Sequence, residues 1–193
     1  MFNRPSVPKE ISAAKLTKWY SSLDEKDVIK LGRYIGNADT SSETTFFVSV
    51  MELSAKDENF KFSAFIGDSG KKMKMNDMER FLFNEKLIES YMGAERYEDA
   101  KATCRESLGI YPKISEKFLK DNNGVLPEKL NCRNNLIDVM VGIDIDYDGA
   151  FKMLDHFFEL NLIDKETYDL RVQSLKIHRM QRVFDGVYTY RPK

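Results

Sequence analysis

Residues 81–112 constrain the fold of this chain more than any other stretch, because their apolar spacing predicts two helices folded back on each other. The segment reads FLFNEKLIESYMGAERYEDAKATCRESLGIYP. Just before it, Asn76 and Glu79 form a potential capping box, so the first helix can begin near Asp77. The residues that this helix is predicted to bury are Met78, Phe81, Leu82, Ile88 and Tyr91.

A second helix is predicted after a short break, Gly93-Ala94-Glu95-Arg96. Pro112 is expected to end this helix, because proline lacks a backbone N–H and cannot continue one. A connection this short forces the two helices into an antiparallel pair. The apolar stripe of the second helix consists of Tyr97, Ala100, Cys104, Ser107 and Leu108.

This hairpin resembles a tetratricopeptide unit, although the resemblance covers only this segment and the chain has no clean second copy. The matching residues are Tyr91, Tyr97, Ala100, Ser107-Leu108 and Pro112. The chain departs from the family pattern at Glu95, where the turn glycine would fall. It also departs at Asn84 and Ile88, where the family prefers a large apolar and a small residue. Because such repeats normally need neighbours to bury their faces, a generic helical hairpin is the alternative interpretation.

The remaining sequence also favours helices, so we expect one all-α domain over residues 1–193. Its antiparallel hairpins, about eight to ten helices in all, would pack as an irregular bundle or short superhelix. Residues 44–66 leave an alternative open, since strand-forming residues there allow an α+β fold with a small β-hairpin. Residues 67–70 and the following KKMKM are expected to form a flexible connector, and residues 150–185 to form an appended helical hairpin.

Composition limits the classes of partner. The formal net charge is −1, so no overall field attracts nucleic acid or an anionic membrane. The chain has two cysteines without a CxxC motif, and Cys104 is expected in the core. The N-terminal residues have no apolar run like that of a signal peptide, and no segment has the roughly 18 apolar residues of a membrane span. We therefore expect a cytoplasmic protein without a membrane partner.

An acidic loop is the sharpest chemical signal. Asp144, Asp146 and Asp148 alternate before Gly149, and Asp155 stands at the twelfth position. This pattern resembles an EF-hand, whose carboxylates bind calcium from one face of the loop. The resemblance implies a Ca²⁺ or Mg²⁺ site, with Mg²⁺ or vacancy favoured because aspartate is shorter than the usual glutamate. The alternative is that the carboxylates cap the following helix.

No other motif predicts catalysis, a zinc-binding helix or a cofactor site. His156 and His178 have no acidic partner at a diagnostic spacing. We therefore expect a non-catalytic interaction or scaffold protein that binds another protein or itself. Its predicted interaction surface comprises Tyr91, Tyr97, Phe157 and Phe158. The alternatives are a divalent-ion-binding regulator, a small helical enzyme, and a nucleic-acid-binding protein that uses the basic, aromatic-rich residues 176–193.

Overall fold

The fold is all-α, as predicted. In a computed structural model that describes residues 6–189, with side chains described over 6–184, these residues form ten α-helices, one 3₁₀ helix and no strand. The β-hairpin alternative for residues 44–66 is therefore wrong. The elements are α1 (Lys9–Ala13), α2 (Thr17–Ser22), α3 (Glu25–Leu31), η1 (Ile35–Asn37), α4 (Glu43–Lys56), α5 (Phe60–Gly70), α6 (Asp77–Gly93), α7 (Tyr97–Asp121), α8 (Asn131–Gly142), α9 (Tyr147–Glu159) and α10 (Lys165–Thr189).

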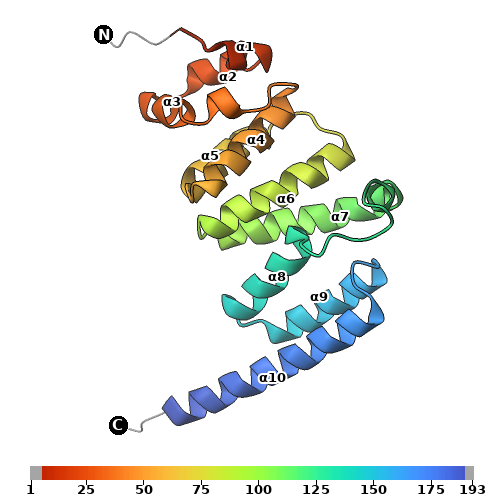
Figure 1. The fold of residues 1–193 in the computed structure, drawn as a ribbon. Helices are drawn as coiled ribbons and strands as arrows, with labels where there is room; N and C mark the ends of the chain where they lie inside the picture. The colour runs from red at the N-terminus through yellow and green to blue at the C-terminus, as the bar shows by residue number, and fades with distance from the viewer. Residues whose placement is uncertain (1–5, 190–193) are drawn as a thin grey trace.

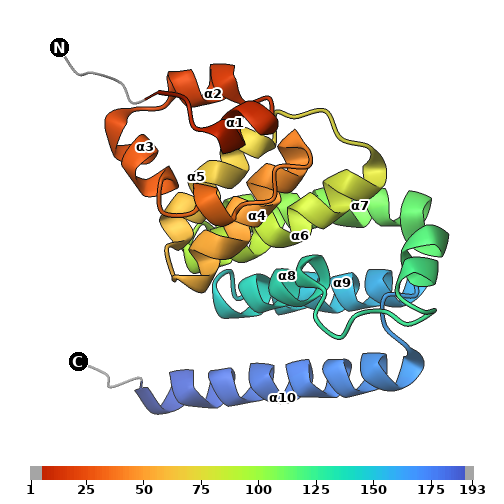
Figure 2. The ribbon, with the colours of Figure 1, turned by 45° about the horizontal axis from the view of Figure 1, so that its top comes forward.

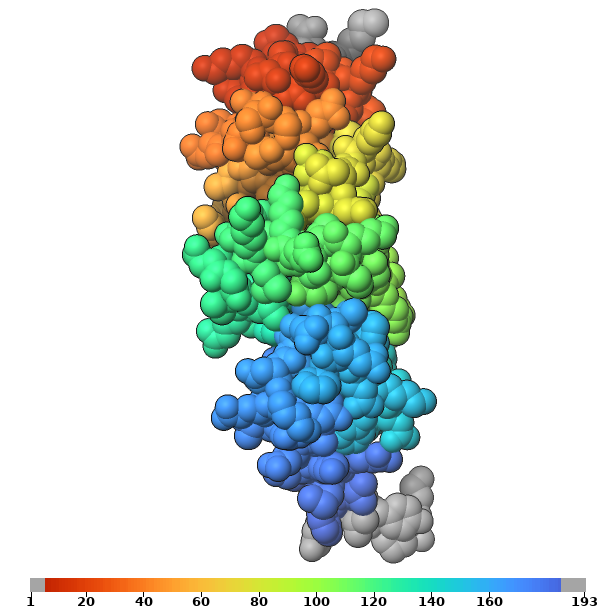
Figure 3. Space-filling model, turned by 90° about the vertical axis from the view of Figure 1, so that its right-hand side faces the viewer, coloured from red at the N-terminus to blue at the C-terminus, as the bar shows by residue number. Residues whose placement is uncertain are grey.

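The helices form an elongated stack in chain order, with α1–α3 at one end and α10 at the other (Figure 1). The space-filling view shows the same succession along a single column (Figure 3). Each helix from α4 onward packs against its neighbour in sequence, and α6 also contacts both α4 and α8. The pairs α4/α5, α6/α7 and α9/α10 are hairpins, so the chain is a short stack of antiparallel helix pairs.

Five connections share one backbone geometry. In each, a non-glycine residue adopts a positive φ, and the next N–H bonds the carbonyl five residues back. This is the Schellman arrangement that commonly ends helices. At Glu95, where a tetratricopeptide unit would have glycine, φ is 59° and the Arg96 N–H reaches the Tyr91 carbonyl at 2.8 Å. The other four positive-φ residues are Lys15, Glu58, Asn123 and Asn161.

The predicted hairpin of α6 and α7 is confirmed, together with its capping box. The Asn76 N–H donates to the Glu79 carboxylate, and the Glu79 N–H donates to Asn76 Oδ1, both at 2.9 Å. The prediction that Leu82 is buried was wrong, because its side chain is 49% exposed. Phe83 and Leu87 are fully buried in its place, since α6 packs on neighbours at two sides.

Pro112 does not end α7, contrary to the sequence prediction. The helix continues to Asp121 and bends sharply in its last turns (Figure 2). Proline removes one helical hydrogen bond and its ring crowds the preceding turn, which bends a helix without necessarily breaking it. Ile114 and Phe118 are buried, so packing holds the bent segment in helical form.

The expected flexible connector at residues 67–70 is instead the end of α5. Gly67 and Gly70 are buried there, facing side chains of α4 and α6. A Cβ atom added at Gly70 would lie 2.7 Å from the Phe83 ring, so the missing side chain allows the helices to approach closely. Glycine in this segment therefore serves helix packing, and the predicted connector at residues 67–70 is wrong.

The buried side chains form two clusters that meet in α6. One contains residues of α1–α5, and the other contains residues of α7–α10, including Leu154 and Phe157 of the predicted C-terminal hairpin. Cys104 and Cys132 are free, buried thiols, and burial raises the pKa of each. This confirms the expected core position of Cys104. Over residues 6–189, no helix has the length and apolarity needed to cross a membrane.

Candidate functional site

Three adjoining hollows cross one side of the stack. The first, of about 580 Å³, lies among α8, α9 and α10; the second, of about 660 Å³, lies mainly between α6 and α8; and the third, of about 370 Å³, lies between α4 and α6. Asn134 and Asp138 line both the first and the second, whereas Lys86 and Glu89 line both the second and the third. The hollows therefore form one continuous depression across α4, α6, α8 and α10, which we name the inner groove.

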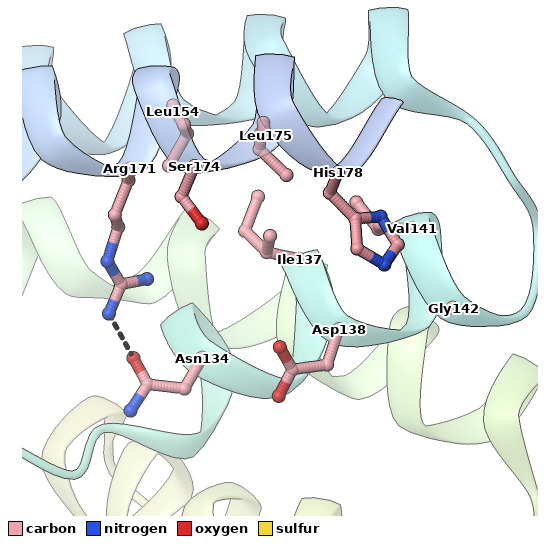
Figure 4. Close-up of a pocket in the computed structure, with 10 residues that line it drawn as sticks. All are labelled: Asn134, Ile137, Asp138, Val141, Gly142, Leu154, Arg171, Ser174, Leu175 and His178. Atoms are coloured by element: carbon pink, nitrogen blue, oxygen red, sulfur yellow. Dashed lines mark hydrogen bonds between the residues drawn. The ribbon is translucent and has the colours of Figure 1, made fainter. Parts of the chain in front are cut away.

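Asparagine amides of α8 form part of the wall of the inner groove. The Asn131 amide donates to the Glu85 carbonyl at 2.8 Å and accepts from Asn135 Nδ2 at 3.2 Å. Asn134 Oδ1 accepts from Arg171 of α10 at 3.2 Å, the bond drawn in Figure 4. These bonds hold the amides in defined orientations, and amides both donate and accept hydrogen bonds.

Charged side chains of both signs line the inner groove. Lys86 Nζ lies 2.8 Å from a Glu52 carboxylate oxygen, which joins α4 to α6 across the depression. Asp138 faces the groove from α8, where partial burial raises the pKa of its carboxyl while the positive charge of Arg171 opposes that rise. Glu89 is exposed and has no ion pair within the described residues. A ligand in the groove would therefore meet both cationic and anionic groups.

The hollow beside α10 contains a serine, a histidine and an aspartate, the side chains that many hydrolases combine. In the described structure, however, no hydrogen bond joins Ser174, His178 and Asp138 (Figure 4). His178 Nδ1 instead bonds the Tyr147 hydroxyl at 2.7 Å. A nucleophile needs a base within hydrogen-bond reach, so the arrangement offers no activated serine.

The acidic loop does not bring its four predicted ligands together. Among residues 6–189, no group of three or more His, Cys, Asp and Glu side chains is placed to hold a metal ion. Asp146 caps α9, which is the alternative that the sequence left open. Each carboxylate has a separate protein partner: Asp144 contacts Lys101 Nζ (2.6 Å), Asp146 the Gly149 N–H (2.9 Å), Asp148 Arg179 (2.9 Å) and Asp155 the Tyr168 hydroxyl (2.6 Å).

Ile145, in the middle of this loop, has a φ of 60°, which is strained for a β-branched side chain. Asparagine tolerates this conformation, and Ile145 is 49% exposed, so Ile145→Asn loses little buried area. We expect the variant to raise the free energy of unfolding by about 1 kcal/mol, measured by urea denaturation. Ile143→Asn is the control, because Ile143 is 50% exposed and has a negative φ. An equal gain in both variants would contradict the strain argument.

The predicted aromatic interaction surface is divided by the structure. Tyr91 is 1% exposed, donates its hydroxyl to Asp68 and packs under Arg96, while Phe157 is fully buried. These two residues therefore belong to the core, because both lie on the helix faces that contact neighbouring helices. Tyr97 is half-buried and Phe158 is 41% exposed.

Sequence reasoning missed the groove residues of α8. Asn131, Asn134, Asn135 and Asp138 follow one another at i, i+3, i+4 and i+7, which places them on one helical face. This polar stripe, opposite the buried Leu136 and Met140, was a readable signal. A polar stripe alone does not predict a groove, because polar stripes normally face solvent.

The basic residues near the C-terminus are partly committed to contacts within the chain. Arg179 pairs with Asp148 and His178 with Tyr147, whereas Lys176 and Arg182 are exposed. Tyr190, Arg191 and Lys193, which the nucleic-acid alternative also invoked, lie outside the described residues, as does the side chain of Tyr188.

No family model, curated protein or solved structure matches this chain.

Proposed function

We propose that this chain is a non-catalytic binding protein that holds an extended segment of another protein in the inner groove. The observation that carries the proposal is the row of amide and carboxylate side chains on α8, which faces a depression continuous across four helices. Stacked helix pairs commonly present such extended concave surfaces to partners.

The chemistry of the groove fits a polypeptide ligand. An extended peptide exposes an N–H and a C=O at each residue, and asparagine amides can pair with both. Asn135 Oδ1 has no partner among the described residues, so it is available to accept from a ligand N–H. Lys86, Arg171 and Asp138 offer charges of both signs that would fix the direction and register of the segment.

A charge reversal on the groove wall tests this proposal. Partners are captured from native extract with the immobilised chain, and overlapping peptides from each are titrated by fluorescence anisotropy against Asp138→Lys. We expect at least about tenfold weaker binding, since one charged contact reverses sign. Glu116→Lys makes the same charge change at an exposed position of α7, outside the groove, and should leave the affinity unchanged. Equal affinities of both variants and the original chain would refute binding in the inner groove.

A further inference from the structure

A further hollow, of about 600 Å³, lies outside the inner groove, between two loops of the C-terminal half. Residues 124–128, before α8, line one side, and residues 161–164, before α10, line the other (Figures 1 and 2). We call this hollow the loop pocket. Among the described residues that line it, only Arg171 also lines the inner groove. Its apolar walls are formed by Leu119, Val125, Leu126, Pro127, Leu162 and Ile163.

Two arginine side chains line the loop pocket and share one hydrogen-bond acceptor. Arg133 Nε donates to Asn134 Oδ1 at 3.1 Å, and Arg171 Nη2 donates to the same oxygen at 3.2 Å, the bond drawn in Figure 4. The shared oxygen therefore holds two positive charges close together. Burial lowers the pKa of the Arg133 guanidinium, and the charge of Arg171 lowers it further, against smaller opposing effects that include Glu85.

Neither of these guanidinium groups lies within 4.0 Å of a carboxylate oxygen in the described structure. Arg133 spends other N–H groups on the carbonyls of Leu162 at 2.7 Å and Glu128 at 2.6 Å. Arg171 has only the bond to Asn134 among the described residues, so most of its donors remain available. An anion in the loop pocket would bind these donors, and its charge would relieve the repulsion between the two arginines.

Two carboxylates also line the loop pocket, but both side chains are exposed. Asp164 Oδ1 accepts the Thr167 N–H at 2.7 Å and so caps α10, whereas Glu128 has no side-chain bond in the described part of the chain. Water and salt screen the charges of exposed groups strongly. Arg133 is 7% exposed, so its charge acts on a bound ligand with less screening.

We propose that the loop pocket binds a small carboxylate with an apolar body, of the type of a medium-chain fatty acid, with its carboxylate on Arg171. The two oxygens of a carboxylate match the planar fork of a guanidinium, which can donate to both at once. The apolar body would cover Val125, which is 69% exposed, and pack on Ile163. A volume of about 600 Å³ is typical of sites for small ligands. This inference does not rest on the proposed function, because the loop pocket lies outside the inner groove.

Calorimetric titration of the full chain with octanoate tests this site. We expect saturable binding, and at least about tenfold weaker binding to Arg171→Met, which keeps an apolar stem but loses the guanidinium. Arg182→Met makes the same change at an exposed arginine of α10 outside the loop pocket, and should bind octanoate as the original chain does. An original chain that does not bind octanoate, or equal affinities of the original chain and Arg171→Met, would overturn the proposal.

A second variant keeps the test decisive if the Arg171 change disturbs folding, which circular dichroism and the melting temperature would reveal. Val125→Glu leaves the core intact because Val125 is exposed. It removes part of the apolar wall and adds a negative charge beside the ligand, so it should also weaken octanoate binding by about tenfold or more. Unchanged binding to this variant would contradict the placement of the ligand in the loop pocket.

Other ligands test the chemical class. Octanamide has the same chain without the charge, and inorganic phosphate has charge without the chain, so each should bind at least about tenfold more weakly than octanoate. Equal or tighter binding of either would overturn the assignment to an apolar carboxylate. Acetyl-glycyl-leucine with a free carboxylate should also bind more weakly, because its peptide groups would be desolvated against the apolar walls. Tighter binding of this peptide would assign the loop pocket to the C-terminus of a protein and overturn the free ligand.

Discussion

Glu85→Ala is expected to lower the free energy of unfolding by about 3 kcal/mol, although the change removes only one carboxylate. Glu85 lies on α6, and its carboxylate accepts the N–H groups of Asn131 (2.5 Å) and Cys132 (3.0 Å) at the start of α8. Alanine would leave both donors without their partner, and each lost bond in a partly buried site costs about 1–3 kcal/mol. Urea denaturation measures the loss.

Glu89→Ala is the matched control, because Glu89 lies one helical turn further along α6 and is exposed. It should change the free energy of unfolding by less than about 0.5 kcal/mol. Comparable effects of the two substitutions would show that the bonds to α8 contribute little. In that case the packing of α6 on α8 would depend on apolar contacts alone.

The same residue gives the stability a defined pH dependence. Burial raises the pKa of the Glu85 carboxyl above its ordinary value of 4.5, against the opposing effects of its N–H bonds and of Arg133. The folded state therefore retains a proton to higher pH than the unfolded state does. This contribution to stability is complete below pH 4.5 and is lost as pH rises through the raised folded pKa. Glu85→Gln has no titratable proton at this position. The free energy of unfolding of the original chain, measured relative to that of this variant, should therefore fall as pH rises across that window.

Gly93→Ala should destabilise the protein by about 2–3 kcal/mol, because there is no room for a side chain at that position. A Cβ atom at Gly93 would lie 2.6 Å from Phe60 Cδ2 and closer still to other atoms of the ring. The nearest ring atoms include Cγ, which only a rotation about χ1 of Phe60 would carry away, so the ring cannot yield as the tip of a flexible side chain would. Relief requires that rotation, away from the preferred packing of the ring, or a movement of α5 or the end of α6.

Gly109→Ala should have the opposite effect. Gly109 is exposed within α7, and an added Cβ meets no atom within 4 Å. Alanine there should stabilise the protein by about 1 kcal/mol, because it restricts the unfolded chain and favours the helix. Thermal and urea denaturation of both variants checks the pair. A loss of stability in both would mean that the space around α7 is tighter than the described structure indicates.

Local signals in the sequence predicted the helices well. The bonds between Asn76 and Glu79 involve residues three apart, so the capping box was readable without tertiary information. The same holds for the short break that makes α6 and α7 antiparallel. Periodicity does not show how many sides of α6 are covered by other helices. For this reason it predicted Leu82 as buried and missed Leu87.

The errors in the sequence interpretation share a physical cause. Pro112 and Gly70 weaken a helix locally, yet contacts made by residues distant in sequence outweigh that weakness. The acidic loop was ambiguous for the same reason. Alternating carboxylates can bind a metal ion or form ion pairs with Lys101 and Arg179. Only the fold brings those two cations within reach. The inner groove was beyond local reasoning, because it exists only where α4, α6, α8 and α10 are placed side by side.

The position of α6 between the two buried clusters has a consequence for how the molecule opens. In a linear stack each layer is supported only by its neighbours, so fluctuations begin at the ends, at α1–α3 and at α10. α6 has support on both sides, and its amide hydrogens become accessible to exchange only when both halves have lost their order. The groove wall on α6 thus belongs to the slowest-opening part of the molecule, whereas the wall supplied by α10 belongs to the fastest. A ligand bound to both walls would hold α10 in place, so the α10 end of the stack could lose its order only as fast as the ligand dissociates.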